Sequence, residues 1–378
     1  MVIVFAALLA FGIFLLQRTV YSRLWRKGLK VSLTFEKGMV RAGEEVRLSE
    51  VIENHKRLPL PSLKVKFQCS RHLIFSDSTN SSVTDRYYRN DLFSVMPYQR
   101  ITRTHRIICP QRGYYGIYGI DLVGVDLFFS EEMMSSLSSE TVLYVLPAAL
   151  PFAQTEQAVR RISGDLVTRR HEIEDPFTYK GIREYQPYDE PKAINWKASA
   201  RTGELKVNIR ENTSVSSVRI FMNLEDSDIL RKEELLEMSI SLCGGIAEYL
   251  LKEGVRLSVF SNARDCVSGQ ELRLENLADQ VSMEGIFKAL ARLDLSSPMD
   301  KFGTAFREKL FEEQDAVYTI FISPDTHEDY QQVIADYQSM REQENDFIWI
   351  CPVKRDGIQD VFERLRSKTV LIKEQEKV

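Results

Sequence analysis

The sequence predicts a multi-domain protein with an N-terminal transmembrane helix, an all-β sandwich and an α/β domain built on a mostly parallel sheet. Three observations predict this order. An uncharged apolar run opens the chain, short strand-like runs without helical spacing fill residues 28–150, and strand-like runs alternate with amphipathic helices over residues 216–378. Such alternation implies crossover connections and a sheet covered by helices on both faces. The 378 residues are enough for two soluble domains behind one helix.

The transmembrane helix is predicted over residues 1–21. Residues 2–16 carry no charge, and residues 1–21 span about 31 Å at 1.5 Å per residue, which matches the hydrocarbon thickness of a bilayer. The next fourteen residues carry no acid and five bases, Arg18, Arg23, Arg26, Lys27 and Lys30. The positive-inside rule therefore predicts a single-pass protein of the cell membrane with cytoplasmic soluble domains. A cleaved signal peptide is the alternative, although the run lacks the basic n-region and the small-residue cleavage site of that class.

The β domain is predicted over residues 28–150. Runs rich in β-branched and aromatic residues predict strands at 31–35, 46–51, 63–67, 117–125 and 142–145. Several short strands at this density, separated by turn signals, predict an immunoglobulin-like sandwich. Two polar, Ser-rich stretches are predicted as loops, 76–90 and 135–139.

The α/β domain is predicted over residues 216–378. Apolar runs predict buried strands at 218–222, 255–260, 317–322 and 347–351, and apolar residues at three-and-four spacing predict the helices between them. Residues 151–215 separate the two domains. They begin with a predicted short helix, 151–162, and their later part is too aromatic for a disordered linker.

Composition and motifs exclude several classes of function. The net charge of −4 argues against a nucleic-acid-binding surface, and the five cysteines show no metal-ligand spacing. Four of the cysteines lie in apolar surroundings, which predicts buried thiols in a reducing compartment. Neither a Gly-rich phosphate loop nor a nucleophile motif occurs in the sequence. We therefore expect a protein that is not an enzyme and does not hydrolyse ATP by itself.

The segment between the domains carries a specific pattern, Arg183-x-Tyr185, Asp189-x-Pro191 and Ile194-x-Trp196-Lys-Ala-Ser-Ala-Arg201. With Arg112-Gly113-Tyr114-Tyr115 and the strand ending at Pro147, it resembles the domain-of-unknown-function 58 family. The resemblance implies an α/β domain similar to von Willebrand factor A, a Rossmann-like fold, and partnership with MoxR-type AAA+ ATPases and other membrane proteins. This chain departs from the family at Tyr188, where Gly is usual, and at Asn195, where Asp is common.

The residues of this segment that match the family pattern are predicted to form a structural or partner-docking site. Its members are Arg183, Tyr185, Asp189, Trp196, Ser199 and Arg201. Arg183 and Arg201 offer planar donor pairs that match the Asp189 carboxylate, and Trp196 is expected to anchor a short helix at 194–200. The catalytic alternative is a hydrolase in which Asp189 acts as general base and Arg201 binds an anion.

A metal site is a further implication of the resemblance. A von Willebrand factor A fold holds a divalent cation with an Asp-x-Ser-x-Ser loop, a Thr and a second Asp, and hard cations prefer such oxygens. The matching positions in this chain are Asn223, Glu225, Ser227, Thr304 and Asp325. Asn and Glu replace the first Asp and Ser, so the sequence predicts either a rearranged Mg²⁺ or Ca²⁺ site or a degenerate one with solvated acids.

Three functions are consistent with these patterns. The first is a non-enzymatic scaffold held at the lipid bilayer, which works with a MoxR-type ATPase in the assembly or maturation of cell-envelope or other protein complexes. The second is a binding switch that depends on a divalent cation, and the third is a hydrolase that uses Asp189 and Arg201. In the first function, partners are expected at the carboxyl ends of the parallel strands, where loops follow Met222, Phe260 and Ile322.

Overall fold

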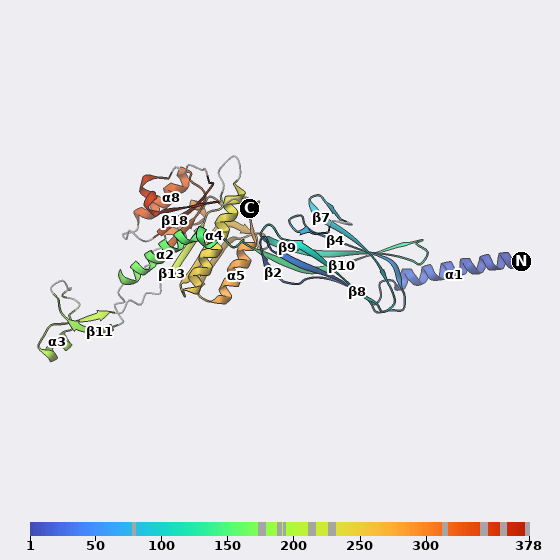
Figure 1. Ribbon diagram of the computed structural model, residues 1–378, viewed down its shortest axis with the longest axis horizontal. Coiled ribbons are helices and arrows are strands. Elements are labelled where there is room, and N and C mark those ends of the chain that lie inside the picture. The colour runs from blue at the N-terminus through green and yellow to red at the C-terminus, as the bar shows by residue number, and fades with distance from the viewer. Residues whose placement is uncertain are drawn as a thin grey trace. The chain divides into compact units, whose positions relative to one another are not determined.

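The computed structural model describes residues 1–77, 81–172, 179–186, 191, 194–210, 217–225, 232–311, 317–340, 347–355 and 361–374. It divides the chain into two compact units, Met1–Ala148 and Ala149–Val378. Figure 1 labels their elements. The segment 151–215 belongs to the second unit.

The first unit begins with helix α1, Val2–Leu24. This helix is long and apolar enough to cross a membrane, and its apolar stretch is exposed in the unit. It continues past the predicted end at residue 21, because Tyr21 and Trp25 pack into the core of the β-strands that follow. The coarse prediction of an N-terminal apolar helix is confirmed.

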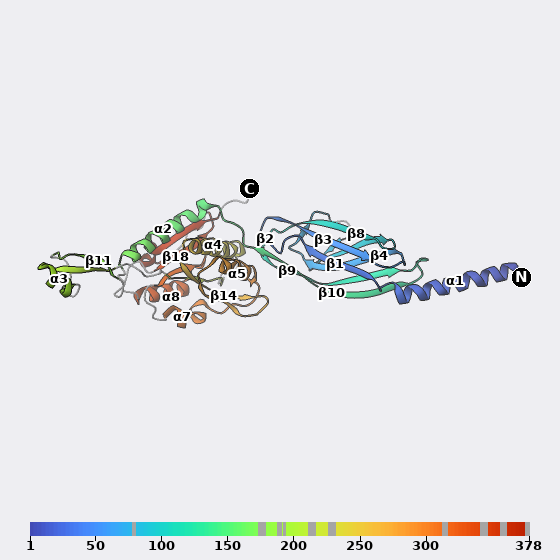
Figure 2. The same cartoon turned by 90° about the horizontal axis from the view of Figure 1, so that it is seen from below.

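Ten described strands follow α1 in the first unit. They are β1 (Leu29–Phe35), β2 (Met39–Arg41), β3 (Glu45–Asn54), β4 (Leu60–Ser70), β5 (Ile74–Phe75), β6 (Ser81–Val83), β7 (Arg86–Val95), β8 (Arg100–Ile108), β9 (Gly113–Val125) and β10 (Glu132–Leu146). One sheet has the order β1-β3-β8-β5 and the other β2-β10-β9-β4-β7-β6. Alternate side chains of both sheets point into one hydrophobic core. The unit is therefore two layers of β-sheet, whose strands can be followed in Figure 2.

The loop predicted at residues 76–90 is wrong in part, and the loop predicted at residues 135–139 is wrong. Residues 76–90 contain β6 and the start of β7, and residues 135–139 lie within β10. In β10, Ser135 pairs with Leu122 and Ser138 with Gly119. The reason is that ladder hydrogen bonds come from the backbone, so an antiparallel strand can form over Ser-rich residues that lack strand-favouring side chains.

The second unit contains an α/β layer structure. Its described elements are α2 (Phe152–Glu172), β11 (Tyr179–Glu184), α3 (Trp196–Thr202), β12 (Lys206–Arg210), β13 (Ser217–Met222), α4 (Glu233–Lys252), β14 (Arg256–Asp265), β15 (Glu271–Leu277), α5 (Gln280–Ala291), β16 (Leu293–Asp294), α6 (Phe302–Ala305), α7 (Arg307–Phe311), β17 (Val317–Ile322), α8 (Glu328–Ser339), β18 (Phe347–Val353), the 3-10 helix η2 (Glu363–Lys368) and β19 (Thr369–Lys373). The main sheet has the order β15-β14-β13-β17-β18-β19. Strands β14, β13, β17, β18 and β19 are parallel, and β15 and β16 run antiparallel to β14.

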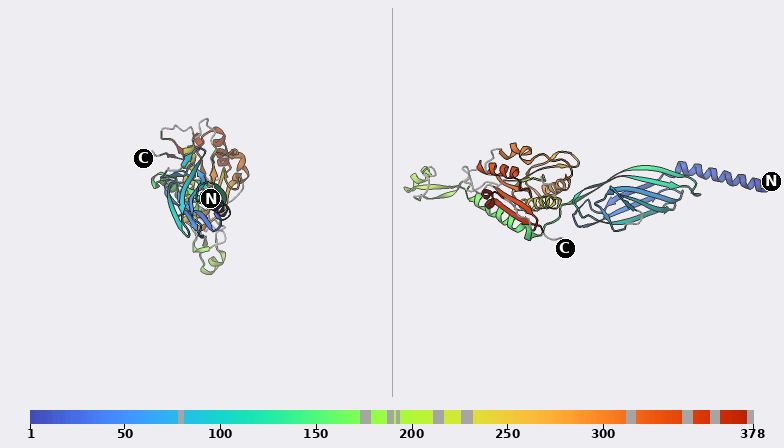
Figure 3. Two further views of the ribbon diagram at one scale, coloured as in Figure 1. Left: turned by 90° about the vertical axis from the view of Figure 1, so that its right-hand side faces the viewer. Right: turned by 90° about the horizontal axis from the view of Figure 1, so that it is seen from above.

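The two faces of this sheet have different cores. Strand residues alternate between the faces, so Ile220 joins an aliphatic core with α2, α4 and α5, while Phe221 joins an aromatic core with α6, α7 and α8. In the right-hand view of Figure 3, α2 (green) and the helices around α8 (orange) lie on opposite sides of the sheet. The predicted parallel sheet covered on both faces is confirmed. Helix α2 exceeds the predicted 151–162, because Leu166 also packs in the aliphatic core.

Candidate functional site

Two of the predicted metal residues, Asn223 and Asp325, lie where parallel strands end, and Thr304 lies on α6. Asn223 directly follows β13, and its N–H donates to the carbonyl of Ile322 at the end of β17 (2.9 Å). Its Oδ1 accepts from Nδ2 of Asn262 (2.8 Å) and from the N–H of Glu225 (3.1 Å). Asn262, on β14, also accepts from the N–H of Leu224 (2.9 Å). Two buried amides therefore connect the ends of three strands.

Asp325 follows β17 and is bound in its own turn. Its N–H donates to Oγ of Ser323 (3.1 Å), and its Oδ1 accepts from the N–H of His327 (2.9 Å). The same oxygen lies 2.7 Å from Nδ1 of His327, which makes an ion pair when the imidazole is protonated. One oxygen of the Asp325 carboxylate is therefore already occupied by two contacts with His327.

Three of the predicted residues line one cleft of about 500 Å³, namely Glu225, Thr304 and Asp325. The other lining residues are Lys301, Phe302, Gly303, His327, Glu328, Asp329, Tyr330 and Val333. Burial raises the pKa of Glu225, and the nearby Asp325 adds to this effect, while the backbone N–H of Phe302 opposes it. Ser227, the fifth predicted residue, lies outside the described residues.

The described residues do not fit a divalent cation. Asn223 uses its oxygen for two donors, and its buried Nδ2 finds no acceptor in the part of the chain that the structure describes. A buried N–H group repels a cation where the family pattern has a carboxylate. Among the described residues, Glu225 and Asp325 also belong to no trio of His, Cys, Asp or Glu side chains within 4.8 Å. The described lining makes this a polar cleft, and a metal site there stays a prediction.

The segment that resembles the family forms a small module of β11, α3 and β12, in which β11 and β12 pair antiparallel. Asn195 caps α3 by accepting from the N–H of Ala198 (3.0 Å), and it also donates to Oδ1 of Asn208 (2.6 Å). Ser199 donates to the carbonyl of Asn195 (2.9 Å) and accepts from the N–H of Lys206 (2.9 Å). The described part of the module is thus held by short polar side chains.

The other predicted residues of the segment are placed differently. Trp196 was expected to anchor the helix inside, and this prediction is wrong, since its surface is 68% exposed. The reason is that Asn195 and Ser199 supply the local order that the indole was expected to supply. Tyr185 donates its N–H to Leu205 (2.9 Å), and Arg183 donates to the carbonyl of Glu184 (3.0 Å). Arg201 is exposed, and Asp189, with Tyr188, lies outside the described residues.

A buried ionic network in the first unit was missed by the sequence analysis. Asp91 accepts from Nε of Arg89 (2.6 Å) and from Nη1 of Arg103 (2.8 Å), and Glu50 lies 3.3 Å from Nε2 of His105. Burial raises the pKa of Glu50, while its contact with His105 lowers it. The two guanidinium groups supply the positive charge that a metal ion would bring. The sequence did contain a sign of this network. Arg89 and Asp91 alternate in step with the buried residues Tyr87 and Phe93 of β7, which places them at inward positions.

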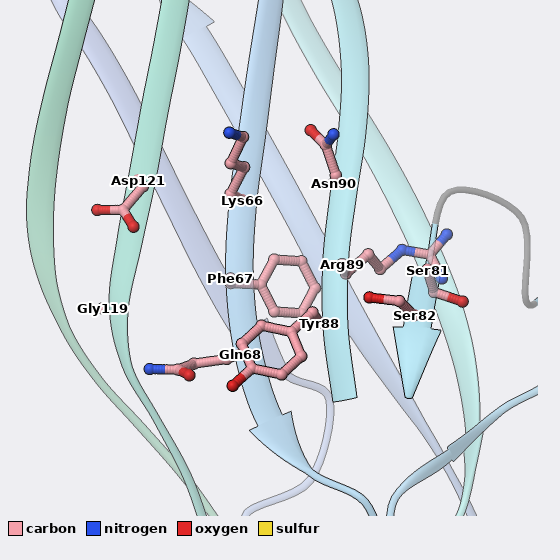
Figure 4. A pocket seen from close by; sticks show the side chains of 10 residues that line it. All are labelled: Lys66, Phe67, Gln68, Ser81, Ser82, Tyr88, Arg89, Asn90, Gly119 and Asp121. Carbon is pink, nitrogen blue, oxygen red and sulfur yellow. The ribbon is translucent and has the colours of Figure 1, made fainter. Parts of the chain in front are cut away.

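A hollow of about 770 Å³ lies on the outer face of strands β9, β4, β7 and β6. Figure 4 shows its polar side chains, among them Lys66, Asn90 and Asp121, on neighbouring strands. Asp121 accepts from Oγ of Ser136 (2.6 Å). Lys66 and Asp121 carry opposite charges. The hollow therefore favours neither an anionic nor a cationic ligand.

The junction of α1 with the strands was also not predicted. Tyr21 is buried and donates its hydroxyl to the carbonyl of Pro59 (2.9 Å). Trp25 is buried against Gly124, where a Cβ atom would lie 2.8 Å from Cε3 of the indole. The last turn of α1 is therefore part of the core of the β unit.

Comparison with known proteins leaves the family open. No family model matches the chain, and no curated protein matches it. Solved structures align with about a third of it. They include AvmM, which catalyses macrocyclization in alchivemycin A biosynthesis (11% identity, 33% of this chain, 94% of that chain, TM-score 0.24), and a non-cellulosomal cohesin from Archaeoglobus fulgidus (10%, 34%, 97%, 0.22). A CARDB domain from Pyrococcus furiosus aligns similarly (15%, 30%, 90%, 0.19). At these TM-scores the likeness carries no functional argument.

Proposed function

We propose that this chain is a membrane-anchored interaction protein that works with an AAA+ ATPase of the MoxR type. In this proposal α1 is a single-pass anchor and both soluble units are cytoplasmic, an orientation supported by the exposed bases Arg23 and Lys27 after the apolar run. The first unit is taken as immunoglobulin-like and the second as similar to von Willebrand factor A. The process served is the assembly or maturation of cell-envelope or other protein complexes.

The observation that carries the proposal is the burial of Tyr21 and Trp25 in the core of the β unit. A signal sequence is removed from the mature protein. Removal of α1 would take Tyr21 out of the core and break its hydrogen bond to Pro59. A helix whose last turn belongs to the folded unit is better explained as a retained anchor.

The β11–α3–β12 module supports the interaction role. Trp196 is 68% exposed, and Ile182 and Leu205 of the same module are exposed as well. Exposed large apolar side chains gathered on a small module are typical of protein contact surfaces, and Trp is enriched among the residues that dominate binding. The ATPase as partner comes from the family resemblance. The sequence contains no phosphate loop of its own, so the partner would supply the energy of ATP hydrolysis.

Recovery from solubilised membranes tests the proposal. The full chain should recover an AAA+ ATPase, identified by mass spectrometry, and Trp196→Ala should reduce this recovery at least tenfold by removing an aromatic contact. Met340→Ala is the matched control, since Met340 is also a large exposed apolar residue of the second unit. Absence of any ATPase with the unchanged protein, or equal recovery with Trp196→Ala, would contradict the proposal.

The cation-dependent switch has one supporting observation, the shared cleft of Glu225, Thr304 and Asp325. It predicts that Mg²⁺ or Ca²⁺ raises the melting temperature by mass action and that Asp325→Ala abolishes the rise. The amide of Asn223 opposes it. The hydrolase alternative stays a hypothesis, because Asp189 lies outside the described residues.

A further inference from the structure

The loop between β9 and β10 presents three consecutive apolar side chains to the outside. Leu127, Phe128 and Phe129 are 48%, 59% and 66% exposed. Exposed apolar residues are common singly, but a contiguous group of this kind marks a surface that contacts a partner or a membrane.

The loop is held in one shape by the buried carboxylate of Asp126. Its Oδ1 accepts from the N–H of Ser130 (2.6 Å) and from the N–H of Glu131 (3.2 Å). The N–H of Phe129 donates to the carbonyl of Asp126 (3.1 Å), and Phe129 has a positive φ of 55°. The turn therefore presents the two phenyl rings outward without further ordering, which reduces the entropy lost on binding.

The same loop lies directly against α1. The ring of Phe128 is 6.0 Å from the ring of Phe14. Gln17 donates to Oδ2 of Asp126 (2.7 Å), and Nε of Arg18 donates to Glu131 (2.6 Å). These contacts place the loop at the level of residues 14–18 of the helix.

The length of α1 sets the depth of that level. The uncharged residues 2–16 cover about 22 Å, which is short of a hydrocarbon core of about 30 Å. A helix that spans the bilayer must therefore immerse residues up to about Tyr21, including Gln17 and Arg18. Polar side chains at that depth need partners, and Asp126 and Glu131 supply them.

Basic and aromatic residues surround the same end of the β unit. Burial lowers the pKa of Lys56 to about 8, and the nearby guanidinium of Arg26 adds to this effect, which places both groups at this end. Tyr98 is exposed and donates its N–H to the carbonyl of Lys56 (3.3 Å), which places it in the same group of loops. The exposed bases Arg23 and Lys27 at this end attract anionic headgroups, and tyrosine is enriched at the membrane–water boundary.

We propose that the end of the β unit beside α1 is seated in the lipid bilayer, with the loop of Leu127, Phe128 and Phe129 inserted among the acyl chains next to the helix. This inference rests on the membrane anchor of the proposed function. It adds that the β unit does not hang freely from α1. Helix and loop together form one lipid-embedded surface, whose orientation is fixed by the contacts at Phe14, Gln17 and Arg18.

Spin labels on the full chain test this insertion. In a Cys266→Ser background the four remaining cysteines are buried, so a new surface cysteine takes the label. We would label Phe129→Cys, Tyr118→Cys and Leu9→Cys separately, in vesicles of phosphatidylcholine and phosphatidylglycerol, and compare accessibility to oxygen with accessibility to an aqueous nickel chelate. Tyr118 is the matched control, since it is an exposed aromatic residue of β9 that lies roughly 23 Å along the strand from its end.

The expected result is that Leu9 and Phe129 favour oxygen, while Tyr118 favours nickel by at least tenfold relative to them. If Leu9 favours oxygen and Phe129 behaves like Tyr118, the insertion is wrong and the anchor stands. If Leu9 itself favours nickel, both the anchor and the insertion are wrong. Labelling at Phe128→Cys repeats the measurement at a neighbouring position, so a local defect at one site does not decide the outcome.

Discussion

Replacement of Asp91 by alanine is expected to destabilise the β unit by about 3–5 kcal/mol, the range for breaking a buried ion pair by removal of one partner. Asp91 is fully buried on β7. Its carboxylate accepts from Arg89 at 2.6 Å and from Arg103 at 2.8 Å. Alanine would leave both guanidinium groups without this partner.

The two arginines contribute unequally to that loss. The Arg103 side chain is 38% exposed and can regain water, whereas the Arg89 side chain is 1% exposed. Arg89 keeps only part of its hydrogen bonding, through the carbonyl of Asp77 (2.9 Å). Arg89 also keeps a longer ion pair with the carboxylate of Asp77 (3.6 Å), so the cost comes mainly from the loss of its short buried bond to Asp91. The double variant Arg89→Met/Asp91→Leu should recover most of this cost, because apolar residues of similar volume carry no desolvation penalty.

Native-state hydrogen exchange on the full chain in detergent measures this prediction. Amides of β7 and β3 should lose protection by the stated free energy, while amides of β13 and β17 in the second unit serve as an internal control and should not change. The reasoning would be refuted by a loss below about 1 kcal/mol in Asp91→Ala, the range of an exposed pair. A double variant no more stable than the single one would refute it equally.

Other predictions concern separate parts of the chain. Trp25→Ala should destabilise the β unit by about 3–5 kcal/mol through loss of a buried aromatic side chain, measured by urea unfolding in detergent, and an unchanged midpoint would exclude the helix from the core. Because the pKa of Lys56 is lowered to about 8, the unfolded chain binds more protons between pH 8 and its ordinary 10.5, so stability should rise with pH over that window. Lys56→Met should therefore stabilise the unit at pH 7 and lose this advantage near pH 10.5; the same gain at both would contradict the assignment. Of the five cysteines only Cys266 is exposed, so alkylation of the native chain should give a single adduct there by peptide mass mapping. Ser199→Ala should expose the amide of Lys206 to faster hydrogen exchange, about tenfold for a lost bond of roughly 1.4 kcal/mol, and unchanged exchange would show that this bond does not order the module.

The sequence predicted the parts of the fold whose signal is local. The run 317–322 is buried at every position and mostly apolar because both faces of β17 are covered, and this pattern predicts a buried parallel strand. Apolar residues at three-and-four spacing predicted α4 and α5, because one side of each helix packs in the aliphatic core. The serines of β10 gave no strand signal, because the ladder with β9 is formed by backbone groups, which no side-chain pattern reports.

The candidate cleft was predicted in part. Glu225 and Asp325 are brought to one cleft because the parallel strands β13 and β17 end at one edge of the sheet, and α6 adds Thr304 to the same cleft. Residue types alone do not show whether a cation fits this cleft. It depends on which donors already occupy Asn223 and Asp325.

Composition and periodicity by themselves determined that this chain has an apolar N-terminal helix, a β unit and an α/β unit, because hydrophobic patterning acts over a few neighbouring residues. Only the tertiary structure decided that Trp25 packs on Gly124 and Phe14 on Phe128, contacts about a hundred residues apart in sequence. The physical reason is that a short stretch of sequence contains only one of the two elements, so it cannot show how they pack against each other. The packing of the helix on the strands, on which the membrane proposal rests, is therefore visible only in the tertiary structure.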